Sequence, residues 1–132
     1  MIFLDTSAIY SLADVRDEMH IEALRIFEAA EKANEEILTH SYVLVESTAL
    51  LQKRLGLNVA LAFLQESTNF TIVWVDNDLH GAGVEHLKQA KLSGLSLVDA
   101  ISFVVMRDTG VATFMGFDKH FSDAGFIRYK SV

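Results

Sequence analysis

Short apolar runs alternate with longer segments of helical spacing along the whole chain. The run over residues 1–4 is too short for a helix, and it stops at Asp5 and two hydroxyl residues, which are side chains that cap helices. The β-branched and aromatic run over residues 70–75 is the clearest predicted strand. Further strands are predicted over residues 36–39, after Gly110 and over residues 125–130, and helices over residues 17–33, 41–55, 58–67, 78–92 and 98–108.

Strands that alternate with helices predict an α/β fold with a central parallel sheet. We expect a three-layer α/β/α arrangement with about four or five strands, and a single domain over residues 1–132. Ligands of such open sheets bind outside the carboxyl ends of the strands, where the strand order reverses. Asp5 follows the first strand and Asp118 follows a late one, so a functional site is expected at this edge.

Composition narrows the possible functions. The chain has 11 basic and 18 acidic side chains, and this net charge of −7 disfavours passive binding to nucleic acid through a basic surface. It has no cysteine, which excludes disulfides and thiolate metal sites. The amino-terminal residues do not resemble a signal peptide, and no apolar run approaches the roughly 20 residues of a membrane span. We therefore expect a cytoplasmic protein without a membrane partner.

Four carboxylates in separate segments are candidates for chemistry. Three of them have an ordinary structural explanation as well: Asp5 as a helix cap, Asp99 in a capping box with Ser96, and Asp118 in an Asx-turn. Glu46 is different, because its neighbours three and four residues away on a helix are largely apolar. It is predicted to face the packing side, where a carboxylate needs a cation or hydrogen bonds.

Oxygen ligands without cysteine or paired histidines favour Mg²⁺ or Mn²⁺ over zinc. No two histidines have the spacing of a helical metal-binding pair, and His120 is expected to support the site rather than to bind the metal. The glycine-rich loops that hold nucleotide phosphates are absent. Ser47 and Ser102 lack a nearby histidine, so a serine nucleophile has little support.

Four short motifs, in order along the whole chain, resemble those of the PIN domain. They are similar in particular to the small PIN-domain toxins of VapBC toxin–antitoxin pairs. These motifs occupy residues 2–8 (IFLDTSA), 45–47 (VES), 95–100 (LSLVDA) and 117–121 (FDKHF). The chain departs from the family at Gly116, where Thr or Ser is frequent, and Asp123 is then an alternative to Asp118 as the last acid.

This resemblance implies a metal-dependent endoribonuclease that hydrolyses RNA phosphodiester bonds with metal-activated water. It implies that Asp5 and Asp99 are the principal ligands of Mg²⁺ or Mn²⁺, and that Glu46 and Asp118 complete the catalytic pocket. The residues expected to hold these carboxylates or the scissile phosphate are Thr6, Ser7 and Ser96.

The resemblance also implies three partners: RNA, a cognate antitoxin that covers the site, and a second copy of the chain. The apolar residues between Ser41 and Ser67 would offer surface to the antitoxin or to a homodimer, unless they belong to the core. Scattered basic residues would contact the RNA: Lys53, Arg54, Lys88, Lys91, Lys119 and Arg128.

Two other functions remain open at this point. A receiver-like signalling domain also has an acidic Mg²⁺ pocket, and Asp76 after the clearest strand would be its phosphate acceptor. It would need adjacent acids after the first strand, where the chain has Asp5 alone. The second is a PIN-like binding module that has lost catalysis, and the four retained acids argue against it.

Overall fold

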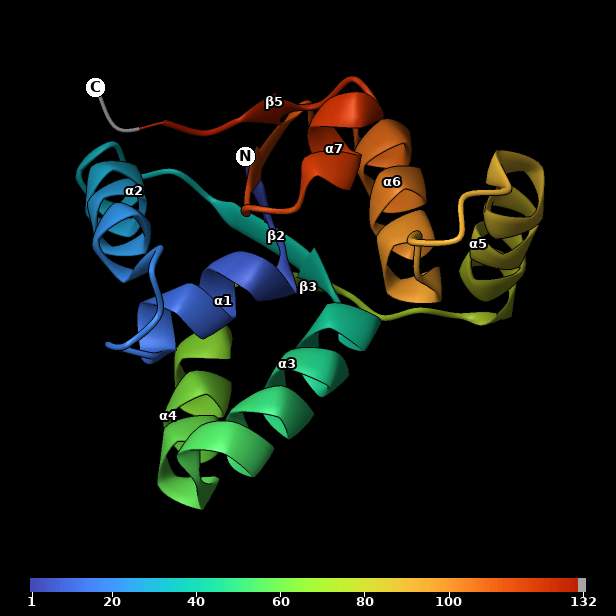
Figure 1. Ribbon diagram of the computed structural model, residues 1–132. Coiled ribbons are helices and arrows are strands. Elements are labelled where there is room, and N and C mark those ends of the chain that lie inside the picture. Colours follow the sequence, from blue (N-terminus) through green and yellow to red (C-terminus); the bar gives the residue numbers. More distant parts are fainter. Residues whose placement is uncertain (131–132) are drawn as a thin grey trace.

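The first strand of the chain lies at the centre of a parallel sheet. The computed structural model describes residues 1–130, and its five strands have the order β3-β2-β1-β4-β5 (Figure 1). Phe3 of β1 pairs with Leu38 of β2 on one side and with Phe114 of β4 on the other. The strands are β1 (Ile2–Leu4), β2 (Ile37–His40), β3 (Thr71–Val73), β4 (Thr113–Met115) and β5 (Ile127–Arg128).

The helices form two packed groups on opposite sides of this sheet (Figure 1). One group is α1 (Thr6–Ala13), α2 (His20–Lys32), α3 (Ser41–Leu55) and α4 (Leu57–Ser67). The other is α5 (Asn77–Ala90), α6 (Leu97–Thr109) and α7 (Lys119–Asp123). The predicted three-layer α/β/α fold with a parallel sheet is therefore confirmed. Within residues 1–130, none of the helices is long and apolar enough to cross a membrane.

Stacked phenylalanine rings join the centre of the sheet to α7. Phe121 lies 4.9 Å from Phe114 and 6.0 Å from Phe3, measured between ring centroids, and all three side chains are fully buried. Burial of one such ring stabilises the fold by about 1.5–3 kcal/mol. The helical spacing did not predict α7, because five residues with one apolar anchor carry no periodic pattern. Phe121 holds this short helix beside the carboxyl end of β4.

The strand order reverses at β1. The chain runs from β1 to β2 and β3 on one side, and then returns to place β4 and β5 on the other side. The carboxyl ends of β1 and β4 therefore border the crevice in which open α/β sheets bind ligands. Asp5 follows β1 directly, and Asp118 follows β4 after two residues.

Candidate metal centre

Asp5 is the N-cap of α1, as the sequence predicted, and it is also a buried acid at the crevice. Its Oδ2 accepts a hydrogen bond from the Ser7 backbone N–H at 3.3 Å and one from the Ser7 hydroxyl at 2.7 Å. The Ser7 Oγ in turn accepts from the Phe117 backbone N–H at 2.9 Å. Ser7 thus holds the Asp5 carboxylate and links it to the loop that carries Asp118.

The pKa of Asp5 indicates that other acids lie close to it. Burial raises this pKa from 3.8 to about 7, the Ser7 hydrogen bonds offset part of the rise, and the negative charges of Asp99 and Asp118 raise it further. Like charges that share a site disfavour one another's ionisation. Three of the four predicted acids therefore meet at this edge of the sheet.

Asp99 begins α6 within the predicted capping box. Its backbone N–H donates to the Ser96 Oγ at 3.1 Å, and its Oδ2 accepts from the Ser96 backbone N–H at 3.3 Å. Only 8% of the residue is exposed, and burial is the main reason that its pKa is raised. Because these bonds engage only Oδ2 of the carboxylate, the capping box is compatible with a second role for Asp99. Ser96 therefore orients the Asp99 carboxylate.

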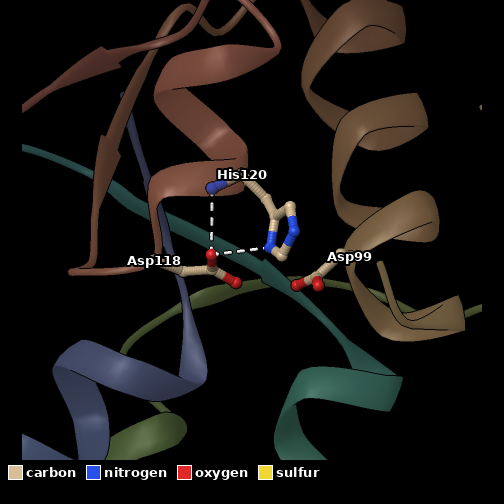
Figure 2. Close-up of side chains that lie close together, drawn as sticks. All are labelled: Asp99, Asp118 and His120. Atoms are coloured by element: carbon tan, nitrogen blue, oxygen red, sulfur yellow. Dashed lines mark hydrogen bonds and ion pairs between the residues drawn. The ribbon is translucent and has the colours of Figure 1, made fainter. Parts of the chain in front are cut away.

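Asp118 and His120 complete the cluster. Figure 2 shows the His120 ring beside both carboxylates, and candidate ligand atoms of Asp99, Asp118 and His120 all lie within 4.8 Å of one another. We call Asp5 and these three residues the acidic site. Asp123 lies at the exposed end of α7, outside this group of three, so the geometry favours Asp118 over Asp123 as the last acid.

The departure at Gly116 has a steric reason. A Cβ on Gly116 would lie 3.1 Å from the Asp5 Cβ and 3.1 Å from the Ser7 Oγ, which is closer than ordinary van der Waals contact. The Ser7 hydroxyl thus lies against the place where a side chain at position 116 would begin. In this chain the hydroxyl that lies between Asp5 and the β4–α7 loop is that of Ser7 in α1.

The predicted orientation of Glu46 is wrong. The side of α3 that is buried carries Val43, Leu44, Ser47 and Leu51, and Glu46 is exposed. Its neighbour Ser47 donates a hydrogen bond to the Thr6 hydroxyl at 3.1 Å, so Thr6 joins α1 to α3, and its predicted role beside the carboxylates stays a prediction. The apolar neighbours of Glu46 on the helix therefore do not imply that its carboxylate binds a cation, and its role as a metal ligand stays a prediction.

Ser102 does have a histidine partner, contrary to the sequence analysis. The His40 Nε2 lies 2.9 Å from the Ser102 Oγ, whose hydroxyl donates to the Val98 carbonyl at 2.9 Å. The Nδ1 of His40 accepts from the backbone N–H groups of Tyr42 and Val43, so the proton is on Nε2 and His40 is the donor to Ser102. Burial also lowers the pKa of His40 to about 4. Both residues of this pair are fully buried, and His40 is the N-cap of α3. Because its Nε2 is the donor to Ser102, His40 cannot act as a base toward a Ser102 nucleophile.

The acidic site fits a divalent cation. Carboxylate oxygens are hard ligands that suit Mg²⁺ or Mn²⁺ better than a soft metal. Burial, and to a smaller extent the repulsion between neighbouring carboxylates, raises the pKa of Asp5 and Asp99, and a bound cation would favour their ionised forms. The residues that would hold the cation are Asp5, Asp99 and Asp118, with His120 beside them.

The fold and this site agree with what is found in known proteins. Residues 2–127 match the PIN domain family, and the chain belongs to this family. It is 35% identical over 132 residues to the 23S rRNA-specific endonuclease VapC20 of Mycobacterium tuberculosis, in the strains CDC 1551 / Oshkosh and ATCC 25618 / H37Rv. The match covers 98% of this chain and 98% of VapC20 in each case.

A solved structure supports the same relationship. The chain is similar to the crystal structure of Mycobacterium tuberculosis VapC20, a sarcin–ricin loop cleaving toxin, with a TM-score of 0.84 and 34% identity. The match covers 96% of this chain and 97% of that one. The receiver-like alternative is therefore overturned. Asp76, its expected phosphate acceptor, instead caps α5, where its Oδ1 accepts from the Leu79 backbone N–H at 2.8 Å.

Proposed function

We propose that this protein is a metal-dependent endoribonuclease, the toxin of a type II toxin–antitoxin pair that acts in the cytoplasm. The observation that carries the proposal is the convergence of Asp5, Asp99 and Asp118, from three separate segments, at the point where the strand order reverses. The similarity to VapC20, which is named as an endonuclease and a toxin, supports the same function.

The chain's own residues would bind and orient the reacting groups. Asp5 and Asp99 would hold the cation as principal ligands and Asp118 would complete the pocket, whereas Glu46, which is exposed on α3, stays a candidate for the same role. A bound Mg²⁺ or Mn²⁺ supplies a water of lowered pKa and neutralises charge on the phosphate oxygens. Ser7 and Ser96 keep the carboxylates in place through the hydrogen bonds described above. Such supporting bonds typically change metal affinity or activity by about 10–100-fold.

Because the protein carries a net negative charge, RNA would be bound by basic side chains close to the acidic site. Lys119 follows Asp118 directly and is exposed, and Lys91 is exposed in the loop before α6. Two other predicted contacts are already engaged with aromatic rings: Arg54 lies over Tyr10 and Arg128 over Phe117. We propose Lys91 and Lys119 as the first phosphate contacts, and an RNA stem-loop of 23S rRNA, the substrate named for VapC20, as the first substrate to test.

The test is cleavage of that RNA with Mg²⁺ or Mn²⁺, with and without a chelator. We expect metal-dependent cleavage by the wild type and by Asp123→Asn, which changes an exposed acid outside the group of three. Asp99→Asn should reduce the rate by at least about a hundredfold, because it removes a charged ligand. Equal rates for the wild type and Asp99→Asn would sink the assignment of Asp99. A protein that binds metal but cleaves none of the RNAs tested would instead be a binding module.

The proposed antitoxin has a suitable groove. A cavity of about 520 Å³ is lined by residues of α1, α2, α3, α4 and β2, among them Ile9, Phe27, Leu51 and Phe63. Four carboxylates also line it: Glu31, Glu35, Glu36 and Glu66. An apolar cavity with acidic side chains is complementary to a basic amphipathic segment. We propose that the antitoxin supplies such a segment, and its addition to the cleavage assay should suppress activity.

Some of the leucines considered for partner binding are not part of the core. Leu57 and Leu61 of α4 are 55% and 52% exposed, whereas Leu51 of α3 is buried. The homodimer stays a prediction, and analytical ultracentrifugation over a range of protein concentrations would test it. The single-domain boundary at residues 1–132 likewise stays a prediction, since its last two residues lie outside the described part of the chain.

A further inference from the structure

His120 gives both of its nearby N–H groups to a single oxygen of Asp118. The backbone N–H of His120 donates to the Asp118 Oδ1, and the Nδ1 of the ring lies 2.9 Å from the same oxygen. Because the partner is a carboxylate, Nδ1 is the protonated nitrogen of this contact. The second oxygen of Asp118 lies on the side that faces Asp99 (Figure 2). The two oxygens of Asp118 are thus not equivalent.

The opposite edge of the ring is confined as well. A Cβ on Gly94, in the loop before α6, would lie 3.3 Å from both the Cε1 and the Nε2 of His120. Gly94 therefore lets the ring lie close to this loop. The side chain of His120 is only 22% exposed, and the ring is held between Asp118 on one side and the loop that leads into the Asp99 capping box on the other.

Without the N–H donors of His120, the Asp118 carboxylate would be free to rotate about its terminal torsion. Rotation about the terminal torsion of an Asp side chain is broad and roughly two-fold, so neither oxygen is preferred by the side chain itself. The backbone N–H of His120, as a single donor, would restrain the Asp118 carboxylate in one direction only. The Nδ1–H of His120 adds a second donor to the same oxygen, and two donors fix the plane of the carboxylate.

We infer that His120 is a positioning residue of the acidic site, which reserves the second oxygen of Asp118, Oδ2, for the cation. The inference rests on the proposed function only in that the site binds a divalent cation. The ring of His120 acts on Asp118 through Nδ1, and Nε2 does not contact the metal directly.

Three substitutions separate the two ring nitrogens. In His120→Asn, the side-chain N–H reaches about as far as Nδ1 and nothing replaces Nε2. In His120→Gln, the amide reaches about as far as Nε2, and nothing replaces Nδ1. His120→Ala removes both. Ser122→Ala, an exposed and neutral change on the same short helix, is the matched control.

The measurement is Mn²⁺ affinity of the RNA-free protein, by titration followed with electron paramagnetic resonance at one fixed pH. We expect His120→Ala and His120→Gln to bind Mn²⁺ about tenfold more weakly than the wild type, whereas His120→Asn and Ser122→Ala stay within about threefold. Circular dichroism and thermal melts establish that each variant is folded.

Two outcomes overturn the inference. Wild-type affinity in His120→Ala would mean that the ring does not position Asp118. Restoration by Gln but not by Asn would mean that Nε2 binds the metal directly. Because no RNA is present, failure of the endoribonuclease proposal is seen separately, as metal binding without cleavage.

Discussion

Gly116 shows how one missing side chain changes the network around an acid. The hydroxyl of Ser7 donates to Asp5 at 2.7 Å and accepts from the Phe117 N–H at 2.9 Å, and its Oγ would lie 3.1 Å from a Cβ at position 116. Position 116 is therefore constrained by what already surrounds it. The family's hydroxyl at this place could not simply be restored here.

A side chain at position 116 should weaken metal binding. We expect Gly116→Ala to lower Mn²⁺ affinity by about tenfold, because its Cβ must displace Ser7 or Asp5 by a few tenths of an ångström. Gly116→Thr should lower it further, since the larger side chain enters the same space. The titration described for the His120 variants measures both. Wild-type or tighter binding by Gly116→Thr would contradict this steric explanation.

At the scale of elements, α5 and α6 lie in close contact at Gly83. A Cβ on Gly83 would lie 2.2 Å from the Ile101 Cδ1, and Ile101 is fully buried in α6, half a turn beyond Asp99. Because this overlap is shorter than any real contact, either the Ile101 side chain or one of the helices would have to move. Gly83 thus allows α5 to pack against Ile101, two residues beyond Asp99.

We expect Gly83→Ala to reduce the free energy of unfolding by about 1–3 kcal/mol, the usual cost of overpacking. Ile101→Val removes the methyl group that the new Cβ would meet, at a cost of about 0.5–1.5 kcal/mol on its own. Urea unfolding of the double variant should therefore show a loss smaller than the sum of the two single losses. Strictly additive losses would show that α5 and α6 do not touch at this point.

The elements were largely predictable from sequence, because their signals are local. Gly56 follows the last residue of α3, and the Ser96–Asp99 capping box starts α6, as the pattern predicted. The face that α3 buries was not predictable. Its apolar residues lie on several sides, and Val45 is 66% exposed, so packing against α1 and α4 decides which side is covered.

The acidic site was predictable in part for the same reason. Asp5, Asp99 and Asp118 each lie in a short local motif at the carboxyl end of the sheet. The pair formed by His40 and Ser102 spans 62 positions of the chain, and the ring of His120 meets a loop residue, Gly94. Contacts of this kind arise from tertiary packing, and a single sequence carries no local pattern that marks them.

For the molecule as a whole, the two buried groups with the largest pKa shifts make opposite contributions to the pH dependence of stability. Asp5 has a pKa of about 7 in the fold, far above the unfolded value of about 3.9. It binds a proton in the folded protein that the unfolded chain has released, so its contribution to stability is lost as the pH rises from about 4 to about 7. His40, with a lowered pKa of about 4, loses its contribution as the pH falls below about 6.5.

The difference between wild type and Asp5→Asn isolates the first of these contributions. In metal-free buffer, we expect the unfolding free energy of the wild type to fall relative to that of Asp5→Asn by on the order of 4 kcal/mol between pH 4 and pH 8. Because His40 is present in both proteins, its contribution cancels. Chemical denaturation at several pH values measures the difference.

Saturating Mn²⁺ should recover much of this loss at pH 8 in the wild type, since a cation favours the ionised carboxylate. Asp5→Asn should gain less, because the Asn side chain brings no charge to the cation. A stability difference that does not change with pH would mean that the Asp5 carboxylate ionises as freely in the fold as in the unfolded chain.

The position of β1 at the centre of the sheet has a consequence for biosynthesis. β1 is made first, yet one of its two edges is covered only when β4 arrives, and the Phe117–Ser7 hydrogen bond spans 110 positions. At typical translation rates, on the order of ten seconds separate the two strands. A nascent chain therefore carries Asp5 long before it carries Asp118, and it has no complete acidic site. The acidic site is therefore assembled only when nearly the whole chain has been synthesised.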